Sequence, residues 1–66
     1  MINYLKVERA KKDITQADLA EAIGVSRQTI NAIEKRKFVP SSILALKLAR
    51  YFETRVEDIF KLEDDD

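Results

Sequence analysis

Residues 15–34 read TQADLAEAIGVSRQTINAIE, and this stretch decides the fold. Thr15 is followed three residues later by Asp18, a variant of the capping box that begins a helix. Apolar side chains then recur at helical spacing up to Ile23. Gly24 comes next, at the position where helices commonly end in the left-handed conformation. The pattern predicts one short helix that stops sharply at Gly24.

A second helix is predicted to follow almost at once. Ser26 is suited to cap it, and Ile30 and Ile33 are spaced to face inward. A turn this short makes two helices cross steeply, at roughly 90–120°. The small Ala20 near the turn lets the helices approach closely, and Val25 fills the angle between them. The stretch therefore predicts a rigid bracket, residues 15–34, that presents its second helix on one surface.

The rest of the chain also favours helices joined by short turns. The sequence holds 66 residues with one glycine and one proline, and no alternating pattern long enough for a useful strand. We expect a first helix from about Asn3 to Lys12, a fourth opened by Pro40–Ser42, and a short fifth at Val56–Phe60. The predicted fold is all-α with five helices: a single domain over 1–62 and an acidic C-terminal tail over 63–66.

Composition excludes several kinds of function. The chain has no cysteine and no histidine, which rules out thiolate and imidazole metal sites and Ser-His or Cys-His catalysis. We expect no enzyme, cofactor or small-molecule ligand. The run Glu63–Asp66 is either a solvated tail, which is the usual case, or a carboxylate metal site. No membrane span and no secretory signal is evident, so a cytoplasmic location is expected.

Charge is unevenly distributed although the formal net charge is zero. Between residues 27 and 50 there is a single acidic residue, Glu34, and there are six basic ones: Arg27, Lys35, Arg36, Lys37, Lys47 and Arg50. A cluster of positive charge matters more for phosphate binding than the total charge does. Lys35, Arg36 and Lys37 form a basic loop suited to clamping a nucleic-acid backbone. Thr15 and Gln16 begin a helix, where free N–H groups attract an anion.

The outer face of the helix after Ser26 carries side chains that can read bases. Arginine donates two hydrogen bonds to guanine, and glutamine pairs bidentately with adenine, which suits Arg27 and Gln28 in the first turn. Ala32 is small enough for a thymine methyl group, and Asn31 can read a base edge or reach a phosphate. Each of these residues would also be ordinary on a solvated helix face, so the chemistry alone leaves both readings open.

The bracket resembles the helix-turn-helix of phage repressor and Cro-type regulators, also called the xenobiotic-response-element family. The shared pattern is T-Q-x-x-L-A-x-x-x-G-V-S-x-x-x-I-x-x-I-E. The similarity extends to Leu5 and Arg9, to Pro40–Ser41, and to residues 44–49 and 56–60, so it covers nearly the whole chain in order. It implies a five-helix, lambda-repressor-like DNA-binding domain.

The resemblance also implies roles for individual residues. Base reading is implied for Arg27, Gln28 and Ala32, and extends to Thr29 and Asn31. A phosphate contact is implied for Gln16, and a structural ion pair for Arg9 with Glu34. The sequence departs from the family pattern at Lys35–Arg36, Glu53 and Arg55. A non-glycine residue forced to positive φ there costs on the order of 1 kcal/mol, so local loop geometry is expected to differ.

The function expected from these observations is sequence-specific binding of double-stranded DNA by a transcriptional repressor. One protomer covers too few base pairs for specificity, so we expect a homodimer on a palindromic operator. Apolar residues after the fourth helix suggest the dimer surface: Val56, Ile59, Phe60 and Leu62. The alternative is an antitoxin-like module that binds a protein partner and contacts DNA only secondarily.

Overall fold

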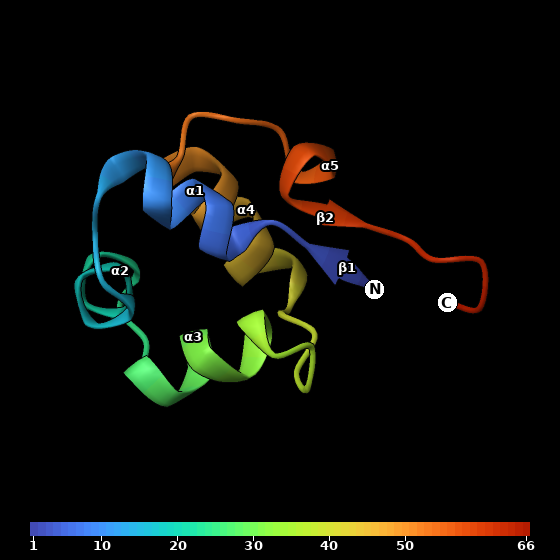
Figure 1. The fold of residues 1–66 in the computed structure, drawn as a ribbon, viewed down its shortest axis with the longest axis horizontal. Coiled ribbons are helices and arrows are strands. Elements are labelled where there is room, and N and C mark those ends of the chain that lie inside the picture. Colours follow the sequence, from blue (N-terminus) through green and yellow to red (C-terminus); the bar gives the residue numbers. More distant parts are fainter.

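The computed structural model describes residues 1–66 and contains five helices and two short strands (Figure 1). The expected five-helix architecture is therefore confirmed. In chain order the elements are β1 (Ile2–Asn3), α1 (Leu5–Lys12), α2 (Gln16–Ile23), α3 (Arg27–Glu34), α4 (Ser42–Tyr51), α5 (Val56–Ile59) and β2 (Phe60–Lys61). None of the helices has the length and apolar character needed to cross a bilayer.

The first helix begins at Leu5, two residues later than the sequence predicts. Asn3 lies in β1 instead, and its side chain accepts a hydrogen bond from the Leu5 N–H at 3.3 Å. The same side chain donates to the carbonyl oxygen of Ile33 at 2.8 Å. Asn3 therefore lies just before α1, accepts from the first N–H of that helix and links it to the end of α3.

A two-stranded antiparallel pairing joins the two ends of the chain. Ile2 pairs with Lys61 and Asn3 with Phe60, and the Tyr4 N–H donates to the Ile59 carbonyl at 2.8 Å. As a result α5 ends at Ile59, and Phe60, which was expected in the helix, is extended. Two-residue strands carry no alternation of their own, so the local sequence gave no sign of this pairing.

The core draws side chains from every helix. The fully buried ones are Leu5, Leu19, Ile30, Ile33, Leu48 and Ile59, and Ala20, Ala49, Phe52 and Phe60 complete the buried set. These include Ile30 and Ile33, the residues of the bracket that were predicted to face inward. Ile59 was also expected at a dimer surface, and that expectation is wrong because its side chain is fully buried in the protomer, whereas Phe60 is 8% exposed and lines a surface groove.

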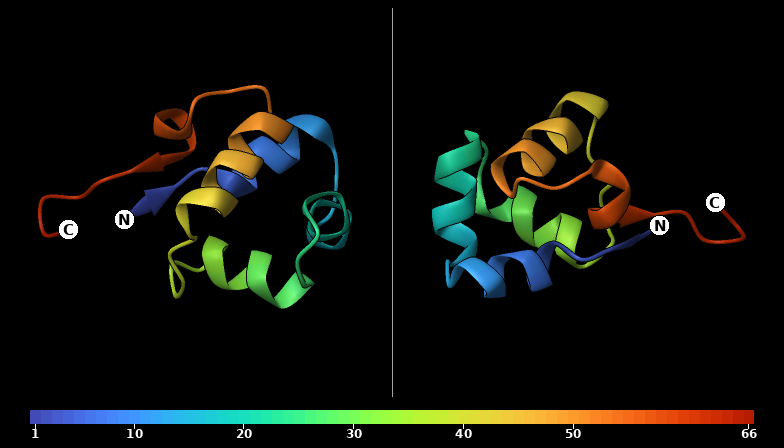
Figure 2. Two further views of the ribbon diagram at one scale, coloured as in Figure 1. Left: turned by 180° about the vertical axis from the view of Figure 1, so that it is seen from behind. Right: turned by 90° about the horizontal axis from the view of Figure 1, so that it is seen from above.

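The acidic tail folds back onto the start of the chain. In Figures 1 and 2 the two termini lie side by side. The N-terminal ammonium group lies 3.1 Å from a Glu63 carboxylate oxygen and 3.0 Å from one of Asp66. Glu63 also pairs with Arg36. Residues 63–66 thus contact the domain through exposed ion pairs, and no group of three or more acidic side chains converges as a metal site would require.

Candidate nucleic-acid interface

The bracket forms through the caps that its sequence contains. Thr15 Oγ1 accepts from the Asp18 N–H at 3.0 Å, and the Asp18 carboxylate accepts from the Thr15 N–H at 3.1 Å. The hydrogen bonds from the backbone and hydroxyl of Thr15 hold the pKa of Asp18 below its ordinary value. Gly24 ends α2 at φ 86°, and Ser26 caps α3 by accepting from the Thr29 N–H at 3.1 Å. The two helices consequently meet at the steep crossing visible in Figure 1.

The outer side of α3 divides into free and engaged side chains. Arg27 and Gln28 are exposed in the first turn, and neither side chain makes a hydrogen bond or ion pair within the chain. Thr29, Asn31 and Ala32 are half-buried, and the Thr29 hydroxyl lies 2.9 Å from that of Ser26. Of the five residues predicted to read bases, Arg27 and Gln28 are thus the ones held out fully toward solvent.

A hydrogen-bonded network fixes α1, α2 and α3 relative to one another. The Arg9 guanidinium donates to both carboxylate oxygens of Glu34, at 2.6 and 3.0 Å, and to the Ile14 carbonyl at 3.0 Å. The Gln16 amide donates to Glu34 at 3.1 Å and to Asn31 Oδ1 at 3.2 Å. The network contains the Arg9–Glu34 pair that the resemblance implies.

This network neutralises Glu34, the one acidic residue of α3. Burial raises the pKa of Glu34, but the hydrogen bonds from Arg9 and then Gln16 outweigh burial and leave the pKa below its ordinary value. Glu34 therefore stays ionised beside a fixed positive charge. It adds little repulsion toward a phosphate backbone, although it belongs to α3.

Gln16 is committed to the network in this structure. A glutamine amide has two N–H donors, and those of Gln16 already serve Asn31 and Glu34. The phosphate contact of Gln16 stays a prediction, and it requires the amide to release one of these partners. Thr15, beside it, is exposed at the start of α2, and its contact with phosphate is likewise a prediction.

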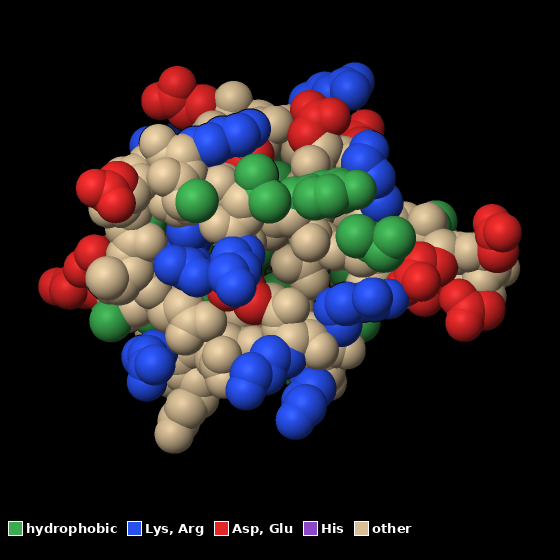
Figure 3. Space-filling view, viewed as in Figure 1, with side chains coloured by type: hydrophobic (Ala, Val, Ile, Leu, Met, Phe, Trp, Pro, Cys, Tyr) green, Lys and Arg blue, Asp and Glu red, His purple; other side chains and the backbone are tan.

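The basic loop after α3 is exposed but not uniform. Lys35 and Lys37 make no ion pair within the chain, whereas Arg36 donates to the Met1 carbonyl at 3.2 Å and pairs with Glu63. Arg36 also adopts a φ of 63°, one of the positive angles expected where the chain departs from the family pattern. Figure 3 shows Lys and Arg side chains gathered along the edge of the molecule that α3 forms in Figure 1, while acidic groups cover the tail.

Comparison with known proteins agrees with this geometry. A family model described as helix-turn-helix matches residues 5–59, from the start of α1 to the end of α5. The chain belongs to the helix-turn-helix family of DNA-binding transcriptional regulators. The match confirms the resemblance to short repressor- and Cro-type regulators and the lambda-repressor-like fold.

Relatives match this regulator over 88–100% of its length. An uncharacterized HTH-type transcriptional regulator of Methanocaldococcus jannaschii is 56% identical over 66 residues, which is 100% of both chains. A second, from Bacillus subtilis, is 46% identical over 65 residues and covers 98% of each chain. A third, from Archaeoglobus fulgidus, is 48% identical over 58 residues, or 88% of this chain and 83% of the other.

Sequence reasoning missed two features of the regulator's surface. The first is the bond from Gln16 to Asn31, which ties a residue assigned to phosphate binding to one assigned to base reading. The second is the pairing of Arg36 with Glu63, which places the acidic tail against the basic loop. Opposite charge was the only available signal for the second contact, and it does not specify which residues meet.

Proposed function

We propose that this regulator reads a palindromic operator in double-stranded DNA as a homodimer and represses transcription. The observation that carries the proposal is the first turn of α3. There Arg27 and Gln28 are exposed and without internal partners, on a helix whose other side is anchored by the buried Ile30 and Ile33. To read bases in the major groove, a helix has to be held rigidly and to carry polar side chains that have no partner within the protein.

Base recognition is assigned to the outer side of α3, beginning with its first turn. Arg27 would donate two hydrogen bonds to a guanine, and Gln28 would pair with an adenine. Ala32 lies one turn later and is suited to a thymine methyl group. Thr29 and Asn31 are half-buried and contribute at the edge of this surface.

Phosphate contacts are assigned to the two sides of α3. Thr15 and Gln16 stand at the start of α2, where the first N–H groups of the helix and its dipole favour an anion. Lys35, Arg36 and Lys37 stand beyond the end of α3. Each phosphate that these residues neutralise makes binding weaker as salt concentration rises.

In this proposal the regulator represses transcription simply by occupying its operator. One protomer offers a single recognition helix, too little for specificity in a genome, so two protomers would bind half-sites about 34 Å apart on one face of the DNA. A dimer seated there blocks access of polymerase to the same segment. The proposal includes a cytoplasmic location.

The test is selection of bound sequences from random duplexes, followed by two variants. Gln28→Ala should relax the preference at one position of each half-site, at a cost of about 1–3 kcal/mol for the favoured base. Lys37→Ala should weaken all sequences alike and reduce the dependence on salt by about one ion per protomer. Lys61→Ala, which removes the same charge from β2, serves as the matched control.

The outcome separates the proposal from its alternative. Selection of a palindrome that loses one preferred base in Gln28→Ala supports it. No sequence preference, together with tight copurification of a co-expressed protein, would instead favour the antitoxin-like interaction module.

A further inference from the structure

The side chain of Asn31 is held at one end only. Its Oδ1 accepts a hydrogen bond from the Gln16 amide at 3.2 Å, whereas its Nδ2 donates to no group of the chain. Every buried side-chain nitrogen and oxygen in this structure has a hydrogen-bond partner, so the half-buried Asn31 must expose its unpaired Nδ2 at the surface. Two free N–H donors of Asn31 therefore stand on the outer side of α3.

The ionised carboxylate of Glu34 decides how two neighbouring amides are oriented. An ionised carboxylate only accepts hydrogen bonds, and Glu34 Oε1 takes one from Gln16 Nε2 at 3.1 Å. The same nitrogen donates its second N–H to Asn31, which has to meet it with an oxygen. Reversal of the Gln16 amide would bring two acceptors together, and reversal of the Asn31 amide would bring two donors together. The direction of hydrogen bonding is thus set by Glu34 and passed through Gln16 to the free N–H groups of Asn31.

Asn31 belongs to a row of donors along α3. Arg27 in the first turn, Asn31, and Lys35 at the end of the helix follow one another at intervals of four residues, so they lie on the same side of α3. A guanidinium and an ammonium group can donate hydrogen bonds but cannot accept them. Since the oxygen of Asn31 is engaged by Gln16, its side chain has the same character, and the whole row offers only donors.

We infer that Gln16 and Glu34 are positioning residues that make Asn31 a donor-only contact to DNA. The inference rests on the proposed function and names the kind of DNA group that Asn31 takes. Its partner has to be a hydrogen-bond acceptor, either the N7 and O6 edge of a guanine or a phosphate oxygen. The bidentate pair of asparagine with adenine is closed to Asn31, because that pair requires Oδ1 to accept from the adenine amino group.

The same arrangement defines how Gln16 acts on DNA. Both of its amide N–H donors serve Asn31 and Glu34, and its Oε1 is the side-chain atom left without a partner. An amide oxygen does not attract a phosphate oxygen. A phosphate at the start of α2 is therefore met by the first main-chain N–H groups of the helix, and the side chain of Gln16 acts through Asn31.

Hydrogen exchange of the side-chain amides tests the orientation in the unaltered chain without DNA. The sequence contains four such amides, at Asn3, Gln16, Gln28 and Asn31. NMR should show exchange about tenfold slower at Gln16 than at the exposed Gln28, and about tenfold slower at Asn3, which donates to Ile33, than at Asn31. Gln28 and Asn3 are thus matched controls of the same residue type. Fast exchange at Gln16, or protection at Asn31, would overturn the inference.

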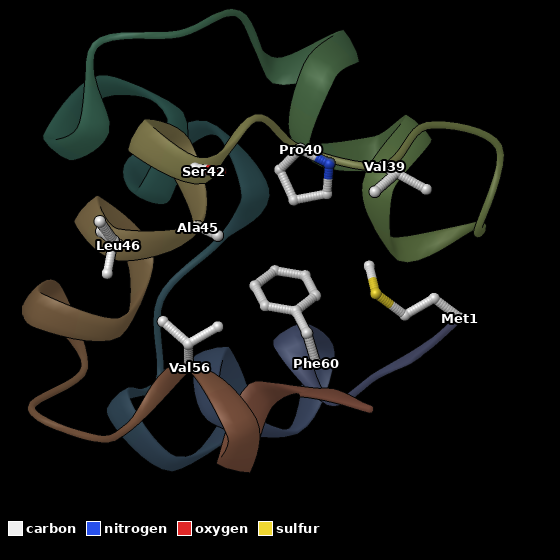
Figure 4. Close-up of a pocket in the computed structure, with 8 residues that line it drawn as sticks. All are labelled: Met1, Val39, Pro40, Ser42, Ala45, Leu46, Val56 and Phe60. Atoms are coloured by element: carbon white, nitrogen blue, oxygen red, sulfur yellow. The ribbon is translucent and has the colours of Figure 1, made fainter. Parts of the chain in front are cut away.

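Selection from random duplexes tests the contact itself. With the natural sequence, guanine should be favoured over adenine about tenfold at one position of each half-site. The preference should fall below about threefold in Asn31→Ala and in Gln16→Met, and Gln16→Met should add nothing when Asn31→Ala is already present. Circular dichroism checks that each variant folds. Neither residue lines the apolar groove around Phe60 that Figure 4 shows, so the substitutions leave that surface unchanged.

A phosphate contact through the same donors gives a different result. No position then favours guanine through Asn31, and a methylphosphonate at the contacted phosphate weakens the natural sequence about three- to tenfold more than it weakens Asn31→Ala. An adenine preference that depends on Asn31, or DNA binding that Asn31→Ala leaves unaltered, would overturn the inference while the proposed function stands. If the exchange rates follow the expected order but no duplex is selected, the proposed function fails and the DNA contact of Asn31 fails with it, while the orientation of the two amides holds.

Discussion

Two arginine–glutamate pairs meet near the C-terminal end of α3, and their surroundings differ sharply. Arg9 and Glu34 are 14% and 7% exposed, and the pair is bound further to Gln16 and Ile14. Arg36 and Glu63 are 52% and 30% exposed and join the basic loop to the tail. A pair withdrawn from water fixes the structure, because loss of one partner leaves the other unsatisfied, whereas an exposed pair contributes little.

The two arginine–glutamate pairs therefore have different roles. The inner pair, Arg9–Glu34, holds α1, α2 and α3 together and thereby fixes the orientation of the outer side of α3. In the outer pair, Arg36–Glu63, a DNA phosphate can replace Glu63, because it offers Arg36 the same kind of anionic partner. Substitutions at the inner pair should therefore alter stability, and those at the outer pair should alter affinity for DNA.

The largest effect is expected from Glu34→Ala. Removal of this carboxylate strands the Arg9 guanidinium and one Gln16 donor, which should lower the free energy of unfolding by about 2–4 kcal/mol. Urea titration followed by circular dichroism measures it. Glu63→Ala is the control and should leave the unfolding midpoint unchanged within error. Equal losses in the two variants would erase the distinction between the pairs.

Acid should weaken the inner pair next. The pKa of Glu34 in the folded chain is below its ordinary value of 4.5, so this stabilisation is complete above about pH 4.5 and is lost as pH falls through the folded pKa. Urea midpoints at pH 7, 4 and 3 should decline in the natural sequence. The decline should be shallower in Glu34→Gln, and identical profiles would show that Glu34 does not govern it.

A smaller loss is expected where the terminal strands meet the bracket. Asn3→Ala removes the hydrogen bond to the Ile33 carbonyl and the acceptor of the Leu5 N–H. The cost should be about 1 kcal/mol, since the Ile33 carbonyl still accepts from the Arg36 N–H and the Leu5 N–H alone loses its acceptor. Asn3→Asp is the informative comparison, because it keeps the acceptor of the Leu5 N–H and loses the donor to the Ile33 carbonyl. Its free energy of unfolding should lie between those of the natural sequence and Asn3→Ala. A loss as large as that of Glu34→Ala would rank the terminal pairing with the inner network.

The smallest effect is expected at the outer pair. Glu63→Gln should release Arg36 and strengthen DNA binding about two- to fivefold at low salt, with the difference fading as salt screens the charges. Fluorescence anisotropy on the selected operator measures it at several salt concentrations. Asp65→Asn also removes one tail charge, but Asp65 makes no ion pair, so an equal gain there would indicate a general charge effect rather than release of Arg36.

Local chemistry explains why most of the helices were predictable. The caps at Thr15, Ser26 and Ser41 and the stop at Gly24 each involve bonds within five residues along the chain. Such bonds form whenever the segment is helical, so their residues are visible as motifs. The positive φ of 55° at Glu53 follows in the same way, from a turn that usually holds glycine.

Long-range contacts could not be predicted from the residues alone. Arg9–Glu34 spans 25 positions and was anticipated only through family resemblance. The bonds of Asn3 to Ile33, Gln16 to Asn31, and Arg36 to Glu63 span 30, 15 and 27 positions, and no motif announces them. They depend on which helix ends the packed core brings together.

By itself the sequence determined the bracket. It set where α2 and α3 start and stop, which side of each helix is buried, and that Arg27 and Gln28 stand in the first turn of α3. Those features follow from periodicity and capping, which act between near neighbours. Only the tertiary structure decided that the chain ends pair as strands and that α4 keeps an apolar face uncovered. Burial is shared among all the helices at once, so it is settled when they pack and not before.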